Sequence, residues 1–226
     1  MTTSGVTHHD LPILHITLPN KMLLDFNSQE KLLKKYKLKT PPTLLIQNQS
    51  ELFSFIEKSN YPIVLKIFST KHLHRTEVSG VVKNIYTKKD ATNSFLRLSK
   101  IKNIEGVIAQ KQIDGFEFVI GIKNDAVFGK TIMFGTGGTM IELFNDVSFR
   151  LLPISKKDGN EILDEIKGSK LLNGFRGKEK INKNIVTETL LSVNEFALAN
   201  DFKEVDFNPV IINSKGVFFC DAKIII

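Results

Sequence analysis

Three oxygen-bearing side chains near the C-terminus are spaced as ligands for a hard metal ion. Asp206 and Asn208 are two residues apart, so on a strand they share one face. A turn at 213–215 reverses the chain and can bring Asp221 beside them. Such oxygens suit Mg²⁺, which binds together with nucleotide phosphates. Acidic residues often flank apolar strand positions without a role, but three inward polar groups would repel one another without a cation. We therefore favour a metal site.

A lysine interrupts the apolar run IVLKIF at 63–68. Burying the ammonium of Lys66 is unfavourable unless it meets an anion. The alternative is that Lys66 reaches the surface or faces solvent from an edge strand, and from this residue alone that alternative is favoured. A bound phosphate would instead give the charge a partner.

The segment STKHLHRTEVSG at 69–80 places His74 between a strand and a turn of small residues. An imidazole followed by cationic and hydroxyl side chains can bind phosphate, and its nitrogen is a competent nucleophile. A lone histidine in a loop is usually neither a ligand nor a nucleophile. His74 is therefore a weak candidate by itself.

Two further segments could contact a nucleotide. The backbone of a strand ending at 110–113 can hydrogen-bond an adenine edge through Gln110, Lys111 and Ile113, and Glu117 can accept from ribose hydroxyls. An ordinary hairpin with a solvated glutamate is favoured by spacing alone. The sequence GTGG at 135–138, which includes Gly137 and Gly138, can form an anion nest but lacks the P-loop pattern. A plain glycine turn explains it equally well.

These residues must be positioned by an α+β arrangement. Apolar periodicity predicts helices that start at Ser28 and Ser50, and further helices at 90–100, 157–167 and 183–200. It predicts strands at 43–47, 63–68, 81–86, 106–113, 117–123, 131–134, 204–212 and 216–225. Short turns between these strands indicate a mostly antiparallel sheet. Residues 1–24, with three histidines and no sustained period, are expected to be an N-terminal extension.

Composition sets the broad class. A chain of 226 residues can form one large domain or two small lobes, and 42% hydrophobic with 24% charged residues is ordinary for a globular protein. One cysteine, no secretory leader and no apolar run near the roughly 18 residues of a membrane span lead us to expect a cytoplasmic protein without a membrane partner. The net charge of +7 invites nucleic-acid binding, but the lysines lack interleaved aromatics, so we expect no nucleic-acid partner.

Five blocks in order resemble the ATP-grasp family, and more closely the β subunit of ADP-forming acetyl-CoA (acyl-CoA) synthetases, which is related to succinyl-CoA synthetase β. The blocks lie at 61–82, 106–138, 142–154, 174–177 and 204–211, and 220–224 looks like the succinyl-CoA synthetase stretch. The resemblance implies an α+β, two-lobed ATP-grasp fold with mostly antiparallel sheets and flanking helices. The domain would span 25–226, with a small lobe at about 25–100 and a second at about 101–226.

The resemblance also implies roles. Lys66 would contact nucleotide phosphates with Gly137 and Gly138 nearby, Gln110, Lys111 and Ile113 would form the adenine hinge, and Glu117 would bind ribose. Asn208 and Asp221 would hold Mg²⁺ with Asp206 beside them, and His74 would carry a phosphoryl group. These implied roles concern the following positions: 66, 74, 110, 111, 113, 117, 137, 138, 206, 208 and 221.

The implied reaction is acyl-CoA + ADP + phosphate ⇌ carboxylic acid + CoA + ATP, through acyl phosphate and phosphohistidine. A CoA-binding α subunit would come from another chain, forming a hetero-oligomer. Two alternatives stay open, and departures from the family pattern at Arg75, Ser79 and Phe116 motivate the second. One is a different ATP-grasp carboxylate ligase that needs no partner, and the other is a non-catalytic nucleotide-binding paralogue.

Overall fold

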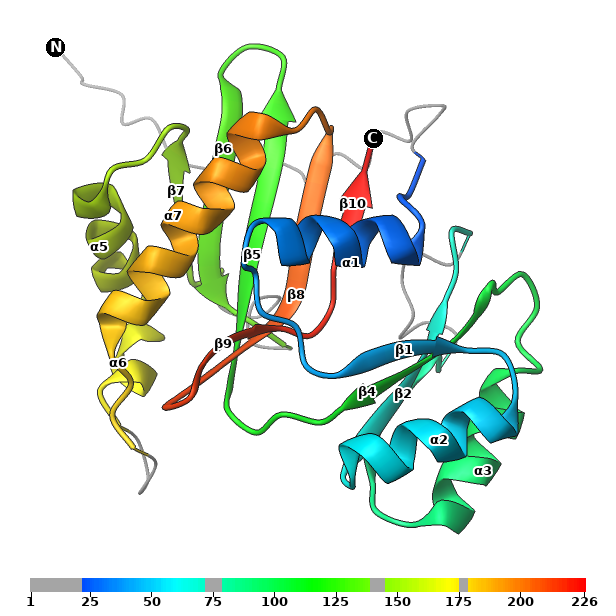
Figure 1. The fold of residues 1–226 in the computed structure, drawn as a ribbon. Coiled ribbons are helices and arrows are strands. Elements are labelled where there is room, and N and C mark those ends of the chain that lie inside the picture. The colour runs from blue at the N-terminus through cyan, green and yellow to red at the C-terminus, as the bar shows by residue number, and fades with distance from the viewer. Residues whose placement is uncertain (1–21, 72–78, 139–144, 175–178) are drawn as a thin grey trace, which may run out of the picture.

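A computed structural model describes residues 22–71, 79–138, 145–174 and 179–226 (Figure 1). Its smaller sheet has four antiparallel strands in the order β1-β4-β2-β3. The strands are β1 (Thr43–Ile46), β2 (Ile63–Phe68), β3 (Val81–Ile85) and β4 (Gly106–Lys111). Helices α2 (Gln49–Ser59) and α3 (Lys88–Leu98) pack on one face of this sheet (Figure 1).

The larger sheet has six antiparallel strands in the order β10-β8-β5-β6-β7, with β9 paired to β8. They are β5 (Phe116–Asp125), β6 (Gly129–Thr136), β7 (Val147–Leu151), β8 (Glu204–Asn213), β9 (Gly216–Phe219) and β10 (Lys223–Ile225). Helices α1 (Phe26–Lys35), α5 (Lys156–Glu165) and α7 (Lys183–Ala199) lie on one face (Figure 1), and the short α6 (Ser169–Leu172) follows α5. The predicted α+β class with mostly antiparallel sheets and flanking helices is confirmed.

Strand alternation decides which side chains of β2 face the site. Ile63, Leu65 and Ile67 are fully buried against α2 and α3. Their neighbours Lys66 and Phe68 must therefore point to the opposite face of the sheet. There Phe68 packs edge-to-face against Phe26 of α1, with ring centroids 5.9 Å apart. The apolar pattern of one strand thus aims its lysine toward the larger sheet.

Several predicted boundaries were wrong. Helix α1 is capped by Asp25, whose carboxylate accepts from the Ser28 N–H at 3.0 Å, and α2 is capped by Asn48 rather than Ser50. In both cases an acceptor side chain stood three residues before an unpaired helix N–H, which is the geometry a cap requires. The predicted strand 216–225 is two strands, β9 and β10, that pair with different parts of β8. Strand β7 and helix α6 were not predicted.

The strand pairing changes sheets later than the predicted lobe boundary near residue 100. Strand β4 is hydrogen-bonded to β1 and β2, so the chain passes to the larger sheet between Lys111 and Phe116. Helix α1, expected in the small lobe, buries Leu33 in the core of the larger sheet. The end of the expected extension also belongs to the fold, because the Leu24 N–H donates to Ile224 O at 2.9 Å. The division into lobes at 25–100 and 101–226 stays a prediction.

Within the described ranges, every helix is too short or too polar to cross a bilayer.

Candidate functional site

The two sheets meet at Lys66. Its side chain is only 7% exposed, and its ammonium donates to Cys220 O, between β9 and β10, and to Gln110 Oε1 of β4 at 3.3 Å. The Asp221 carboxylate lies 3.7 Å from the same nitrogen. The solvent-facing alternative for Lys66 is therefore wrong: the charge is buried and compensated by groups of both sheets. The break between β9 and β10, which the sequence did not predict, supplies two of these partners.

Helix α1 closes one side of this meeting point. Gln29, Glu30 and Leu33 line a small cavity together with Lys66, Gln110 and Asp221. Burial raises the pKa of the Glu30 carboxyl, while the positive charge of Lys66 and a hydrogen bond from Thr40 oppose that rise. A buried acid and a buried lysine thus share one low-dielectric space, in which added charges interact strongly.

The three predicted metal ligands come together on β8 and the segment after β9. Asp206 and Asn208 share the face of β8 that is opposite the buried Val205 and Phe207. The Cys220 N–H donates to Pro209 O at 3.1 Å, and continuing this pairing by one residue places Asp221 beside Asn208. The predicted convergence of these positions is therefore present in the fold, although their role as ligands is untested.

The electrostatics around Asp206 are consistent with a cation site. Burial raises the pKa of Asp206, and the negative charges of Asp221 and Glu204 raise it further, while Lys223 opposes them from 3.7 Å. The ammonium–carboxylate distance is 3.7 Å both for Lys223–Asp206 and for Lys66–Asp221. In the described part of the chain, no three His, Cys, Asp or Glu side chains cluster as a complete metal site. Two carboxylates and an amide fit Mg²⁺ if phosphates and waters provide the remaining ligands.

A second cluster surrounds Glu117. Its carboxylate pairs with Lys83 of β3 at 2.9 Å, so it also joins the two sheets. The Gly137 N–H donates to Glu117 O at 2.9 Å. A Cβ on Gly138 would lie 2.7 Å from Glu117 Oε2, and Gly138 has a φ of +67°, so glycine is required there for two reasons. The structure therefore brings Glu117, Gly137 and Gly138 together as predicted neighbours, with Lys83 as an addition.

The predicted adenine hinge occupies the crossing from β4 to β5. The Gln110 side chain faces the site, where Nε2 donates to Thr43 Oγ1 at 3.0 Å. The Lys111 ammonium turns away from Lys66 and donates to Asn60 O at 3.2 Å and Tyr61 O at 2.6 Å. Ile113 is half-buried in the crossing segment. The expected contact of the Lys111 and Ile113 backbone with adenine stays a prediction.

One feature of the site has no counterpart in the sequence prediction. The Asp146 carboxylate accepts from the backbone N–H groups of Lys167 and Gly168 at 2.6 and 2.7 Å, and from the Thr136 hydroxyl at 3.2 Å. Thr136 directly precedes Gly137 and Gly138. Asp146 therefore connects the glycine turn to the start of α6. Its sequence block was recognised, but nothing in the spacing indicated this contact.

The catalytic candidate His74, with Arg75 beside it, lies outside the described residues.

The comparisons with known proteins agree with this geometry. A sequence model of the family described as "ATP-grasp domain" matches residues 18–226. The chain belongs to the ATP-grasp family.

Two relatives of this ATP-grasp chain differ in length, one nearly equal to it and one much longer. The β subunit of ADP-forming acetate–CoA ligase I from Pyrococcus furiosus is 32% identical over 216 residues, which cover 92% of this chain and 93% of the relative. The ADP-forming acetate–CoA ligase II of Archaeoglobus fulgidus is 34% identical over 206 residues, covering 91% of this chain but only 30% of the relative. The chain therefore spans less than a third of that longer relative.

A solved structure shows the same fold. The acetyl-CoA synthetase 1 of Ca. Korarchaeum cryptofilum, in complex with coenzyme A and Ca-AMPCP, superposes with a TM-score of 0.83 at 32% identity, covering 91% of this chain and 93% of that one. The resemblance stated from the sequence is thereby confirmed.

Proposed function

We propose that this ATP-grasp chain is the nucleotide-binding β subunit of an ADP-forming acyl-CoA (acetyl-CoA) synthetase, acting with a separate CoA-binding α subunit. The observation that carries the proposal is the meeting of Lys66 with Asp221 between the two sheets, beside Asp206 and Asn208. The Pyrococcus β subunit, a relative of nearly equal length, supports the division into subunits. The substrates of the reaction are intracellular, so we expect a cytoplasmic enzyme.

Nucleotide phosphates would bind beside Lys66. Asn208 and Asp221 would hold Mg²⁺, with Asp206 at its side, because these residues present hard oxygens on one surface. When bound, Mg²⁺ would neutralise negative charge on the transferred phosphoryl group. Lys66 contributes a fixed positive charge that is already oriented by Gln110 and Cys220 O, so little reorganisation is needed during transfer.

The nucleoside would extend from the phosphates toward Glu117. The carboxylate of Glu117 would accept from ribose hydroxyls, and the backbone of 110–113 would contact the adenine edge. Gly137 and Gly138 approach this region too closely to carry side chains, because a Cβ would lie 2.7 Å from Phe118 O and from Glu117 Oε2, respectively. The Lys83 ammonium holds Glu117 at 2.9 Å and thereby orients it.

The proposed phosphoryl transfer uses His74. An imidazole nitrogen attacks the γ-phosphorus of ATP, the bond to the bridging oxygen breaks, and ADP leaves; synthesis of ATP is the reverse. Phosphohistidine would then exchange its phosphoryl group with the CoA-binding subunit. A Korarchaeum structure in complex with coenzyme A and Mg-AMPPCP has a phosphohistidine segment that points towards its nucleotide binding site.

The test is ATP formation by the purified chain mixed with the CoA-binding subunit encoded in the same genome. Acetyl-CoA or another acyl-CoA, ADP and phosphate should give ATP, and His74→Ala should abolish it while Mg-ADP binding remains. Activity without the partner that survives His74→Ala would instead identify a different ATP-grasp ligase. Tight Mg-ADP binding with no turnover would identify a non-catalytic paralogue.

A further inference from the structure

The face of the larger sheet that is opposite α5 and α7 carries the candidate metal ligand Asp206 at one end. Strand register continues this face across three further strands. Phe149 of β7 pairs with Met133 of β6, Met133 with Gly121 of β5, and Gly121 with Asp206 of β8. Paired residues of antiparallel strands point to the same side. Phe149 and Asp206 are therefore three strand spacings apart on one face, about 14 Å between backbones.

The β7 end of this face is apolar and open. Phe149 and Leu151 are each 56% exposed. The β5–β6 hairpin that ends beside them carries Val127 and Phe128, which are 82% and 71% exposed. Leu152 fixes this proximity, because its N–H donates to Lys130 O at 2.8 Å. We call the set Val127, Phe128, Met133, Phe149 and Leu151 the β6–β7 apolar surface.

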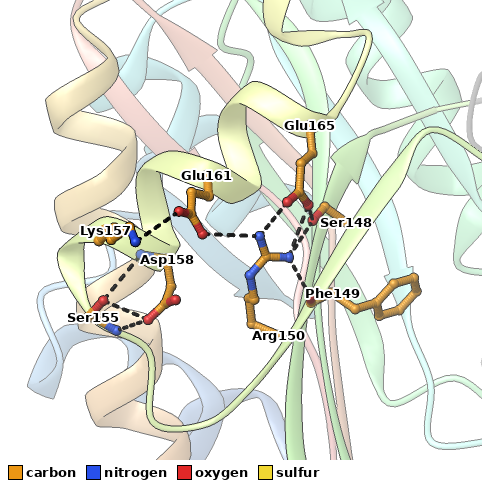
Figure 2. Close-up of polar contacts among 8 residues, drawn as sticks. All are labelled: Ser148, Phe149, Arg150, Ser155, Lys157, Asp158, Glu161 and Glu165. Atoms are coloured by element: carbon orange, nitrogen blue, oxygen red, sulfur yellow. Dashed lines mark hydrogen bonds and ion pairs between the residues drawn. The ribbon is translucent and has the colours of Figure 1, made fainter.

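Side chains of β7 that alternate with these residues hold the strand firmly. Arg150 pairs with Glu165 of α5 at 2.5 Å, and the Ser148 hydroxyl donates to the same carboxylate (Figure 2). Figure 2 shows Phe149 pointing away from this network. Because the register of β7 is fixed by these contacts, Phe149 and Leu151 cannot turn inward to bury themselves. Their exposure is built into the strand.

Several exposed apolar side chains on neighbouring strands and on their hairpin are typical of a protein interface. The Archaeoglobus relative indicates the occupant, since 70% of its length lies outside the region that this chain matches, and a separate subunit would supply that part to this chain. A protein seated on the β6–β7 apolar surface would cover the same sheet face that leads to Asp206. It could therefore deliver a phosphoryl-carrying segment along that face.

We propose that the β6–β7 apolar surface is where the CoA-binding subunit docks. This inference rests on the proposed function and assigns a place to its partner.

The experiment compares the wild-type chain with the double variant Phe149→Ser/Leu151→Ser in titrations with the purified CoA-binding subunit. The double variant should weaken association about tenfold or more, because large apolar side chains dominate interface energetics. Its Mg-ADP affinity should stay within about twofold of wild type. The matched control is Ile185→Ser/Leu198→Ser, which removes two exposed apolar side chains from α7 on the other face and should leave association unchanged.

Phe128→Ser is the second variant, because it changes a hairpin turn and leaves the sheet intact; it should weaken association several-fold even if the double variant folds poorly. Unchanged association of a folded Phe128→Ser and of the double variant would overturn the proposal. So would a wild-type homodimer that these substitutions dissociate, since the surface would then serve self-association. If the wild-type chain neither binds the CoA-binding subunit nor makes ATP with it, the proposed function fails. If the wild-type chain does both and the variants bind equally well, only the docking surface is wrong.

Discussion

Two clusters of charged side chains in this chain hold their ions in different ways. At the β7–α5 contact, Arg150 donates to both carboxylate oxygens of Glu165, at 2.5 and 3.0 Å (Figure 2). The pair Lys66–Asp221, which joins the two sheets, and the pair Lys223–Asp206, which lies within the larger sheet, are both 3.7 Å apart. The first cluster is partly exposed and its ion pairs are short, whereas the second is more deeply buried and its two lysine–carboxylate distances are longer.

This difference indicates that the Arg150 cluster stabilises the fold, whereas the cluster around Asp206 and Asp221 is a candidate binding site. The Arg150 cluster lowers the pKa of Glu165 to about 2, so its charges stabilise one another in the folded chain. In the second cluster, burial raises the pKa of Asp206, and Asp221 raises it further. Burying the Asp206 carboxylate beside other acids is unfavourable in the empty protein, and a bound cation would relieve that cost. The expectations below test this contrast from the largest effect to the smallest.

Lys66→Met should produce the largest loss. Removing the ammonium from the space between the sheets should lower kcat/KM for ATP formation about 10²–10³-fold. Enzymes lose about this much when one fixed donor that stabilises transition-state charge is removed. Lys130→Met is the matched control, because Lys130 is another strand lysine that donates to two carbonyls, Ala197 O and Asn200 O, away from the site. Its kcat/KM should stay within about twofold of wild type. Equal losses in both variants would assign Lys66 a structural role only.

Asp206→Asn should separate stability from binding. The folded-state pKa of this acid is raised above the usual 3.8, so its ionisation is unfavourable in the folded chain once the pH exceeds that range. At pH 7 the variant should therefore melt at the same temperature as the empty wild type or higher. Its Mg²⁺ requirement should rise by about tenfold, because a negatively charged ligand is replaced by a neutral amide. Thermal melts with and without Mg-ADP measure both effects, and a lower Tm for the empty variant would contradict this account.

Asp146→Ala should weaken Mg-ADP binding about five- to tenfold, since it frees Lys167, Gly168 and Thr136 from their shared acceptor and loosens the glycine turn. Thr136→Val removes only the hydroxyl contact and should have a smaller effect. Calorimetric titration with Mg-ADP measures both. If Asp146→Ala lowers Tm but leaves the affinity unchanged, the contact stabilises α6 without positioning the turn.

Glu165→Gln should have the smallest effect and none on nucleotide binding. It should lower Tm by a few degrees at pH 7, because it breaks the bidentate pair with Arg150. The folded pKa of Glu165 is depressed from 4.5 to about 2, so the stabilisation is complete above 4.5 and is lost as the pH falls toward 2. The Tm difference between wild type and variant should therefore shrink across that window. A difference that is independent of pH would contradict the ion-pair explanation.

Much of the fold was predictable because its signals are local. The run IVLKIF predicted β2 at its observed bounds, and the turn at 213–215 predicted the reversal between β8 and β9. The pairing of β4 with β2 and the division of 216–225 into two strands were not predictable, since both depend on which distant strand competes for the same hydrogen bonds.

The site was predicted to a similar extent. Asp206, Asn208 and Asp221 converge as their spacing implied, because alternation and a short turn are sufficient. Lys66 could not be settled from its own strand, since the groups that compensate it come from residues 110, 220 and 221. Lys83 and Asp146 were missed because their partners, Glu117 and Thr136, lie on other strands.

The central claim is that Asp221, together with Asp206 and Asn208, binds Mg-nucleotide. Titrating ADP into wild type and Asp221→Asn, with Mg²⁺ and with EDTA, tests it most directly. We predict that wild type binds ADP more tightly with Mg²⁺ than with EDTA. Asp221→Asn should bind ADP about tenfold or more weakly than wild type when Mg²⁺ is present, whereas the two proteins should have similar ADP affinities in EDTA. Equal Mg²⁺ dependence in both proteins would contradict the account.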